Sequence, residues 1–67
     1  MPTFANKARF ADVRVIRSSP ASLLCLIDGD ECWIPQSQID DDSEVYAEGH
    51  EGELVVSEWI ATQKGLV

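Results

Sequence analysis

Apolar residues gather in short runs along this chain, and Gly, Pro, Asp and Ser separate the runs, which is the pattern of several short β-strands. The clearest pair of runs flanks Asp28-Gly29, a dipeptide that favours a two-residue hairpin because a type I′ turn needs a positive φ at both central residues. The pattern therefore predicts a hairpin over residues 23–35, with Cys25 opposite Cys32. The run before the turn is apolar on both faces, so it is expected to be the most buried strand.

Residues 8–17 are expected to form another strand, with an irregularity inside it. Val13 and Val15 share one face of this strand, while Phe10 and Ile16 share the other. Such a broken alternation predicts a β-bulge, or a strand that is covered in part on both faces.

The second half of the chain predicts shorter elements. A helical turn is expected over residues 35–39, and a short strand over residues 43–46. The last strand begins at Leu54 and runs to residues 57–59, where a short helix follows. In the alternative, Ser57 caps the helix, which then starts earlier.

These elements predict a mainly β fold, namely a small bent sheet or barrel of four to five strands, SH3-like or OB-like, with a short C-terminal helix. Sixty-seven residues suffice for one domain. Residues 7–67 are therefore expected to form a single small β domain that follows a flexible tail, residues 1–6.

The net charge of −7 is unevenly placed along the chain. The first 27 residues carry a net charge of +3, and the rest of the chain carries −10. Lys and Arg supply most of the affinity of proteins for nucleic acid, so an acidic chain is a poor general nucleic-acid binder. A large set of acids instead attracts basic protein surfaces. The charge therefore favours a module that docks a partner protein.

The longest apolar run has five residues, far fewer than the roughly 20 that cross a bilayer. The first residues also lack the apolar segment of a signal peptide. A cytoplasmic protein without membrane contact is expected.

Residue types that carry catalysis are scarce. A nucleophilic triad needs a histidine beside Ser or Cys, and the single histidine, His50, lies in a turn bounded by glycines. Cys25 and Cys32 lie seven positions apart, which fits no zinc pattern. The cross-strand distance between Cys25 and Cys32 would allow a disulfide. Cytosolic thiols stay reduced, however, so two packed thiols are expected. The sequence thus predicts neither an enzyme nor a cofactor.

An acidic run, Asp40, Asp41, Asp42 and Glu44, offers the hard oxygen ligands that divalent cations prefer. It lacks the alternating spacing and the central glycine of a calcium loop. A solvated loop, or an acidic patch that faces a partner, is the expected role.

The two tryptophans, Trp33 and Trp59, suit either a core position or a stacking platform for single-stranded bases. Arg9, Arg14 and Arg17 on the first strand would supply the cations beside such a platform. These five residues are the candidate site for single-stranded nucleic acid.

Four segments carry a resemblance to a known family: Ile-Asp-Gly at residues 27–29, Trp-Ile-Pro-Gln-Ser-Gln-Ile at residues 33–39, Gly-Glu-Leu-Val-Val-Ser-Glu-Trp-Ile-Ala at residues 52–61, and Lys-Gly-Leu at residues 64–66. Together they resemble segments of small uncharacterised bacterial and phage proteins, similar to domains appended to larger nucleic-acid-handling proteins. The resemblance implies a self-contained module in a nucleic-acid setting, and it brings no catalytic residue.

Three functions stay open at this point. The first is a non-enzymatic protein-interaction module whose acidic surface docks a partner protein. The second is a small-barrel binder of single-stranded nucleic acid. The third is a phage-type inhibitor whose acids mimic the charge of nucleic acid. A homodimer would enlarge the small core and is compatible with each of them.

Overall fold

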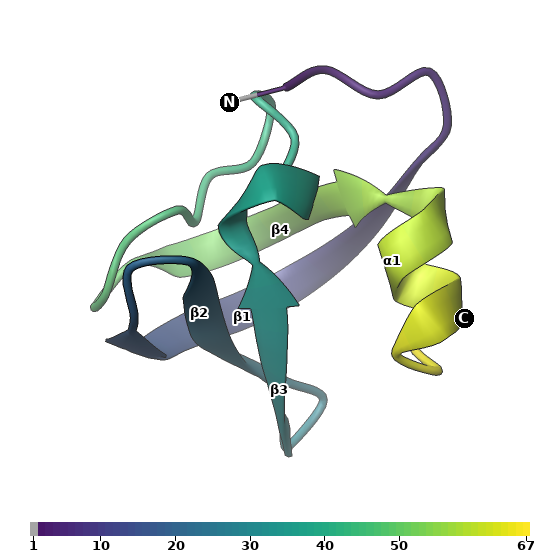
Figure 1. The fold of residues 1–67 in the computed structure, drawn as a ribbon. Helices are drawn as coiled ribbons and strands as arrows, with labels where there is room; N and C mark the ends of the chain where they lie inside the picture. The colour runs from purple at the N-terminus through teal and green to yellow at the C-terminus, as the bar shows by residue number, and fades with distance from the viewer. Residues whose placement is uncertain (1) are drawn as a thin grey trace.

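The computed structural model describes residues 2–67, which form one open antiparallel sheet of four strands and one short α-helix (Figure 1). The mainly β class and the short C-terminal helix are confirmed. The strand order is β3-β2-β1-β4. The elements are β1 (Lys7–Ser18), β2 (Ser22–Ile27), β3 (Asp30–Pro35), the 3-10 turn η1 (Gln36–Gln38), β4 (Glu51–Ser57) and α1 (Glu58–Gln63).

The β2–β3 hairpin has the predicted turn and register. Asp28 and Gly29 both have positive φ angles, 51° and 83°. The turn places Cys25 opposite Cys32, as expected. The hairpin therefore follows from the local chemistry of the turn dipeptide.

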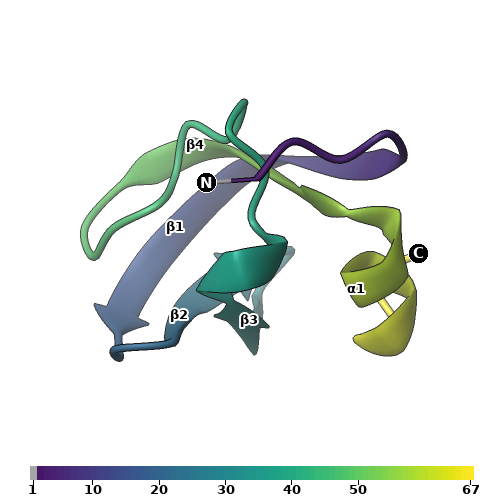
Figure 2. The same cartoon turned by 45° about the horizontal axis from the view of Figure 1, so that its top comes forward.

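The predicted irregularity in β1 is confirmed. The pairing of β1 with β4 shifts register between Phe10 and Val13, where Asp12 has a φ of 57°. The pairing with β2 shifts a second time, between Val15 and Arg17. Bulges bend a strand, so β1 can pair with β4 at one end and with β2 at the other, and the sheet is strongly bent (Figure 2).

The core lies on the concave side of the bent sheet, under α1 and the segment after η1. Alternate residues of β2 reach it, so that the strand is buried on one face and half-buried on the other. The buried apolar residues are Val13, Val15, Leu23, Cys25, Ile27, Ile34, Ile39, Val45, Leu54, Val56, Ile60 and Ala61.

The strand predicted over residues 43–46 is wrong, although its apolar anchor, Val45, is buried. The segment runs along the outer edge of β4 as an irregular chain, and the amide of Glu44 donates to the carbonyl of Glu53 at 2.9 Å. A regular ladder stops there because the hydroxyl of Ser43 takes the place of a backbone partner. It accepts from the amide of Val55 at 3.2 Å and donates to the carbonyl of Val45 at 2.8 Å.

The helix begins as in the alternative prediction, directly after Ser57. The hydroxyl of Ser57 accepts from the amide of Ile60 at 3.2 Å and caps α1. Trp59 is therefore helical, and the last strand ends before it. No helix within residues 2–67 has the length and apolar character that a bilayer crossing requires.

The segment before β1 has no regular secondary structure over residues 2–6, but it makes contacts with two distant parts of the chain. The carbonyl of Pro2 accepts from the amide of Asp41 at 2.8 Å, and the carbonyl of Asn6 accepts from the amide of Glu58 at 3.0 Å. Met1, the first residue of the predicted tail, lies outside the described residues. The flexibility of this tail stays a prediction.

Candidate protein-binding surface

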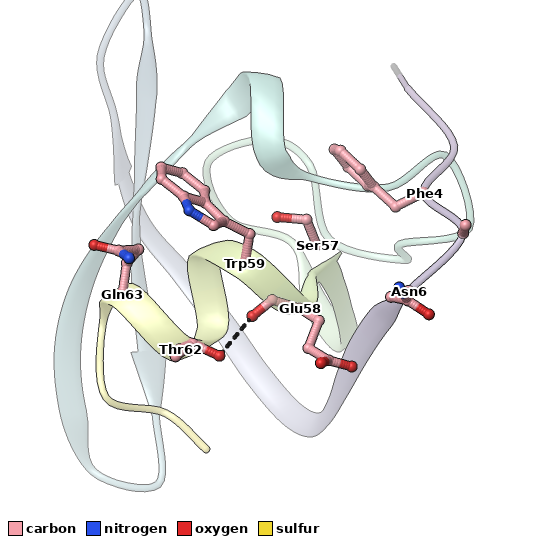
Figure 3. Close-up of a pocket in the computed structure, with 8 residues that line it drawn as sticks. Phe4, Asn6, Ser57, Glu58, Trp59, Thr62 and Gln63 are labelled. Atoms are coloured by element: carbon pink, nitrogen blue, oxygen red, sulfur yellow. Dashed lines mark hydrogen bonds between the residues drawn. The ribbon is translucent and has the colours of Figure 1, made fainter.

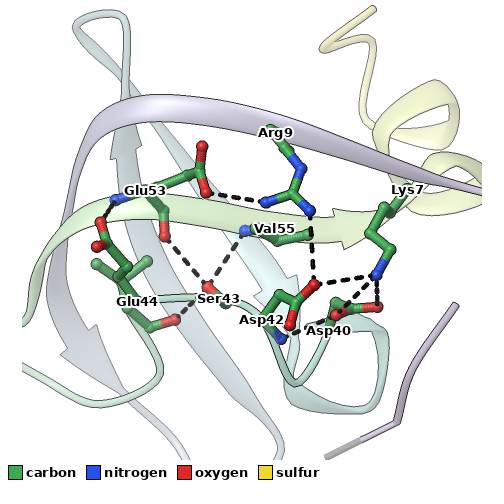
Figure 4. A network of polar contacts seen from close by, with 9 residues as sticks. Lys7, Arg9, Asp40, Asp42, Ser43, Glu44, Glu53 and Val55 are labelled. Atoms are coloured by element: carbon green, nitrogen blue, oxygen red, sulfur yellow. Dashed lines mark hydrogen bonds and ion pairs between the residues drawn. The ribbon is translucent and has the colours of Figure 1, made fainter.

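The cations at the start of β1 lie in a network of ion pairs with the acidic loop (Figure 4). The ammonium of Lys7 lies 3.3 Å from carboxylate oxygens of both Asp40 and Asp42. The guanidinium of Arg9 lies 3.5 Å from Asp42 and 3.0 Å from Glu53. Both cations are thus paired with acids of the same chain.

Asp40, expected in a solvated loop, is fully buried. Its carboxylate accepts from the backbone amides of Phe4 at 2.7 Å and Asp42 at 2.8 Å. These two bonds, together with Lys7, hold the pKa of Asp40 below its usual value against the cost of burial. The carboxylate of Asp40 thus has its hydrogen-bonding and ion-pair partners within the chain itself.

The pKa of Lys7 changes in the opposite direction. Desolvation works against the charged ammonium, but hydrogen bonds to Asp42 and Asp40 outweigh it and raise the pKa of Lys7. Lys7 is therefore part of the support of the acidic loop, and its charge is already compensated.

The rest of the acidic run is exposed and does not converge on one point. Asp41 is exposed, and Glu44 turns back to accept from the amide of Glu53 at 2.8 Å. Within residues 2–67, no three His, Cys, Asp or Glu side chains lie close enough together to hold a metal ion.

The three candidate arginines of β1 do not form one basic patch. Arg9 lies in the network above, and Arg14 pairs with Glu51 at 2.8 Å. Arg17 is exposed and forms no ion pair with any side chain of the described residues. One of the three is thus left for an external anion.

Trp33 lies on the convex face of the sheet, opposite the core. The register places Arg17, Leu24 and Trp33 directly across from one another on β1, β2 and β3. Directly opposed residues point to the same face, so the three side chains form one row. Trp33 is 43% exposed, so it is a surface residue and not a core residue.

Trp59 lies in α1 and is 61% exposed. It lines a shallow groove of about 490 Å³ between α1 and the N-terminal segment, and Phe4 stands across Ser57 from it (Figure 3). The other lining residues include Thr62 and Gln63. Sequence reasoning missed these two residues, although positions 59, 62 and 63 share one face of a helix that starts after Ser57.

The free carboxylates far outnumber the free cations. Three basic side chains pair with four acids, and only Arg17 and Lys64 have no such pair within residues 2–67. Eight exposed acids form no ion pair with the side chains of that range. They are Asp12, Asp28, Asp30, Glu31, Asp41, Glu44, Glu48 and Glu58.

The groups that nucleophilic chemistry would need are engaged elsewhere. Cys25 is buried and has no disulfide partner, and burial together with the neighbouring Cys32 raises the pKa of its thiol to about 11. The ring nitrogen Nδ1 of His50 accepts from the amide of Tyr46 at 3.3 Å. Its ring also packs edge-on against the Tyr46 ring, with centroids 4.5 Å apart.

Comparison of the chain with family models, with curated proteins and with solved structures finds no match.

Proposed function

We propose that this chain is a non-enzymatic protein-interaction module whose acidic surface docks a basic surface of a partner protein. The pairing of charges carries the proposal. Lys7, Arg9 and Arg14 are neutralised by acids of the same chain, while eight exposed carboxylates form no ion pair with any side chain of residues 2–67. Such an excess speeds encounter with cationic surfaces and disfavours anionic ones.

The test uses a fluorescein-labelled peptide of alternating lysine and valine, with a glutamate–valine peptide of equal length as the matched control. Fluorescence anisotropy at low ionic strength should rise with the lysine peptide only, and the affinity should fall as salt is added. Equal binding of the two peptides, or no binding of either at low ionic strength, contradicts the proposal.

The row of Arg17, Leu24 and Trp33 supports a second candidate, a binder of single-stranded nucleic acid. In this row an exposed indole offers a stacking surface for a base, and an unpaired guanidinium on the far side of Leu24 offers a cation for the phosphate backbone. Single-stranded oligothymidylate should then quench Trp33, and Arg17→Glu should remove the effect. Lys64→Glu is the matched control, since it makes the same charge change elsewhere. Unchanged fluorescence at low ionic strength contradicts this candidate.

The exposed acids also support a third candidate, a phage-type inhibitor that mimics the charge of nucleic acid. Its acids would occupy the phosphate-binding surface of a nucleic-acid-binding protein. We also propose that the bent sheet has an SH3-like or OB-like arrangement and that the protein acts in the cytoplasm. Small β modules of these types serve as binding domains, which is consistent with each candidate.

A further inference from the structure

We infer that the free edge of β3 is the docking site, and that it pairs with an extended, basic segment of the partner protein as an added β-strand. This inference rests on the proposed function and specifies its contact. The two edges of the sheet differ, and that difference points to β3.

The edge at β4 is covered by the chain itself. The amide of Asp40 donates to the carbonyl of Val55 at 2.8 Å, and the amide of Glu44 donates to the carbonyl of Glu53 at 2.9 Å. The amide of Val55 in turn donates to the hydroxyl of Ser43. The amide of Glu53 donates to the carboxylate of Glu44 at 2.8 Å, so the outward backbone groups of both Glu53 and Val55 are already bonded and cannot pair with an added strand.

The edge at β3 is open. In a two-residue hairpin the residues next to the turn form a hydrogen-bonded pair, and bonded pairs then alternate along the ladder. Asp30, Cys32 and Ile34 therefore face β2, whereas the amides of Glu31 and Trp33 point outward. Among residues 2–67, no backbone or side-chain acceptor takes up either amide.

Pro35 fits this assignment. It occupies the next outward position of β3, where the absent amide hydrogen costs no ladder bond. Within residues 2–67, the carbonyl of Trp33 accepts a hydrogen bond only from the Cys32 thiol, at 3.9 Å. A thiol is a weak donor, which the amide of an added strand would replace.

Charge selects the occupant of this edge. Asp28, Asp30 and Glu31 are exposed at the hairpin and form no ion pair within the described residues. Glu31 and Trp33 share the convex face, so an added strand places its own side chains beside a carboxylate and an indole. A basic side chain gains an ion pair with the first and a cation–π contact with the second. A second copy of β3 would instead bring together two chains that each carry a net charge of −7.

The test separates strand pairing from attraction by charge alone. The lysine–valine peptide is compared with the same peptide N-methylated at alternate residues, which keeps every charge but cannot form the ladder. The unmodified peptide should bind at least about tenfold more tightly, as expected for the loss of one to two hydrogen bonds. It should also protect the amides of Glu31 and Trp33 from hydrogen exchange.

Two variants of one residue complete the design. Glu31→Gln removes the charge and keeps the outward amide, whereas Glu31→Pro removes both at an edge position that tolerates proline. Glu31→Pro should bind the peptide more weakly than Glu31→Gln, with circular dichroism as the check on folding. Equal binding of the methylated and unmodified peptides, without protection of the two amides, overturns the inference but leaves the proposed function standing. No binding of either peptide overturns the proposed function itself.

Discussion

At the scale of single residues, Asp40 connects its own loop to residues 4–7, which lie far from it in sequence. Its carboxylate accepts from the amides of Phe4 and Asp42 and pairs with Lys7. A buried carboxylate of this kind is a structural support, because its lone pairs are used within the protein.

Asp40→Asn should destabilise the fold at neutral pH. An asparagine amide would turn an N–H₂ donor toward at least one of the two backbone donors, and it would leave Lys7 without its buried partner. Urea denaturation at pH 7 should show a lower midpoint for the variant. Asp42→Asn is the matched control, and the smaller effect is expected there because Asp42 is exposed.

The same substitution should change the response to acid. The pKa of Asp40 is lower in the folded chain than in the unfolded chain, so its contribution is complete above about pH 4, the ordinary value of an Asp carboxyl. It is lost as the pH falls through the folded pKa. The stability difference between the wild type and Asp40→Asn should therefore shrink as the pH falls below 4, and a constant difference would contradict this account.

The two cysteines should differ in reactivity although they face each other. The thiolate is the form of cysteine that reacts with alkylating reagents. Because burial raises the pKa of Cys25 to about 11, almost none of this residue is thiolate at pH 8. Cys32 is only half-buried. Iodoacetamide followed by peptide mass mapping should modify Cys32 first, and Cys25 only when urea is added. Equal rates in the native protein would contradict this.

At the scale of elements, those set by local chemistry could be predicted from the sequence. The β2–β3 hairpin follows from Asp28-Gly29, and the bulge in β1 follows from its broken alternation. The segment at residues 43–46 could not be predicted, because the hydroxyl of Ser43 bonds to β4, a partner distant in sequence. The exposure of Trp33 also depends on which face of the sheet the rest of the chain covers.

Ser57 joins β4 to α1 and should determine how firmly the helix is held. Ser57→Ala removes the cap on the amide of Ile60 and should cost about 1 kcal/mol of unfolding free energy. Ser57→Thr keeps the hydroxyl and should retain most of the stability. Urea denaturation of both variants measures the difference. Equal losses in the two would mean that side-chain volume, and not the cap, determines stability at this buried site.

At the scale of the whole molecule, the unpaired acids affect stability and binding in opposite directions. With a net charge of −7, the folded chain repels itself, and eight exposed carboxylates have no cation of the described residues beside them. Sodium chloride screens this repulsion, so the urea midpoint at pH 7 should rise with added salt. The gain should be smaller in the double variant Asp12→Asn, Asp41→Asn, which has less repulsion to screen.

Binding of a basic peptide should weaken over the same range of salt. Because the protein becomes more stable as the binding weakens, unfolding cannot account for the loss of binding. A midpoint that falls with salt would mean that the ion pairs of Lys7, Arg9 and Arg14 outweigh the repulsion, and the excess of free acids could then no longer be regarded as the dominant electrostatic feature of the molecule.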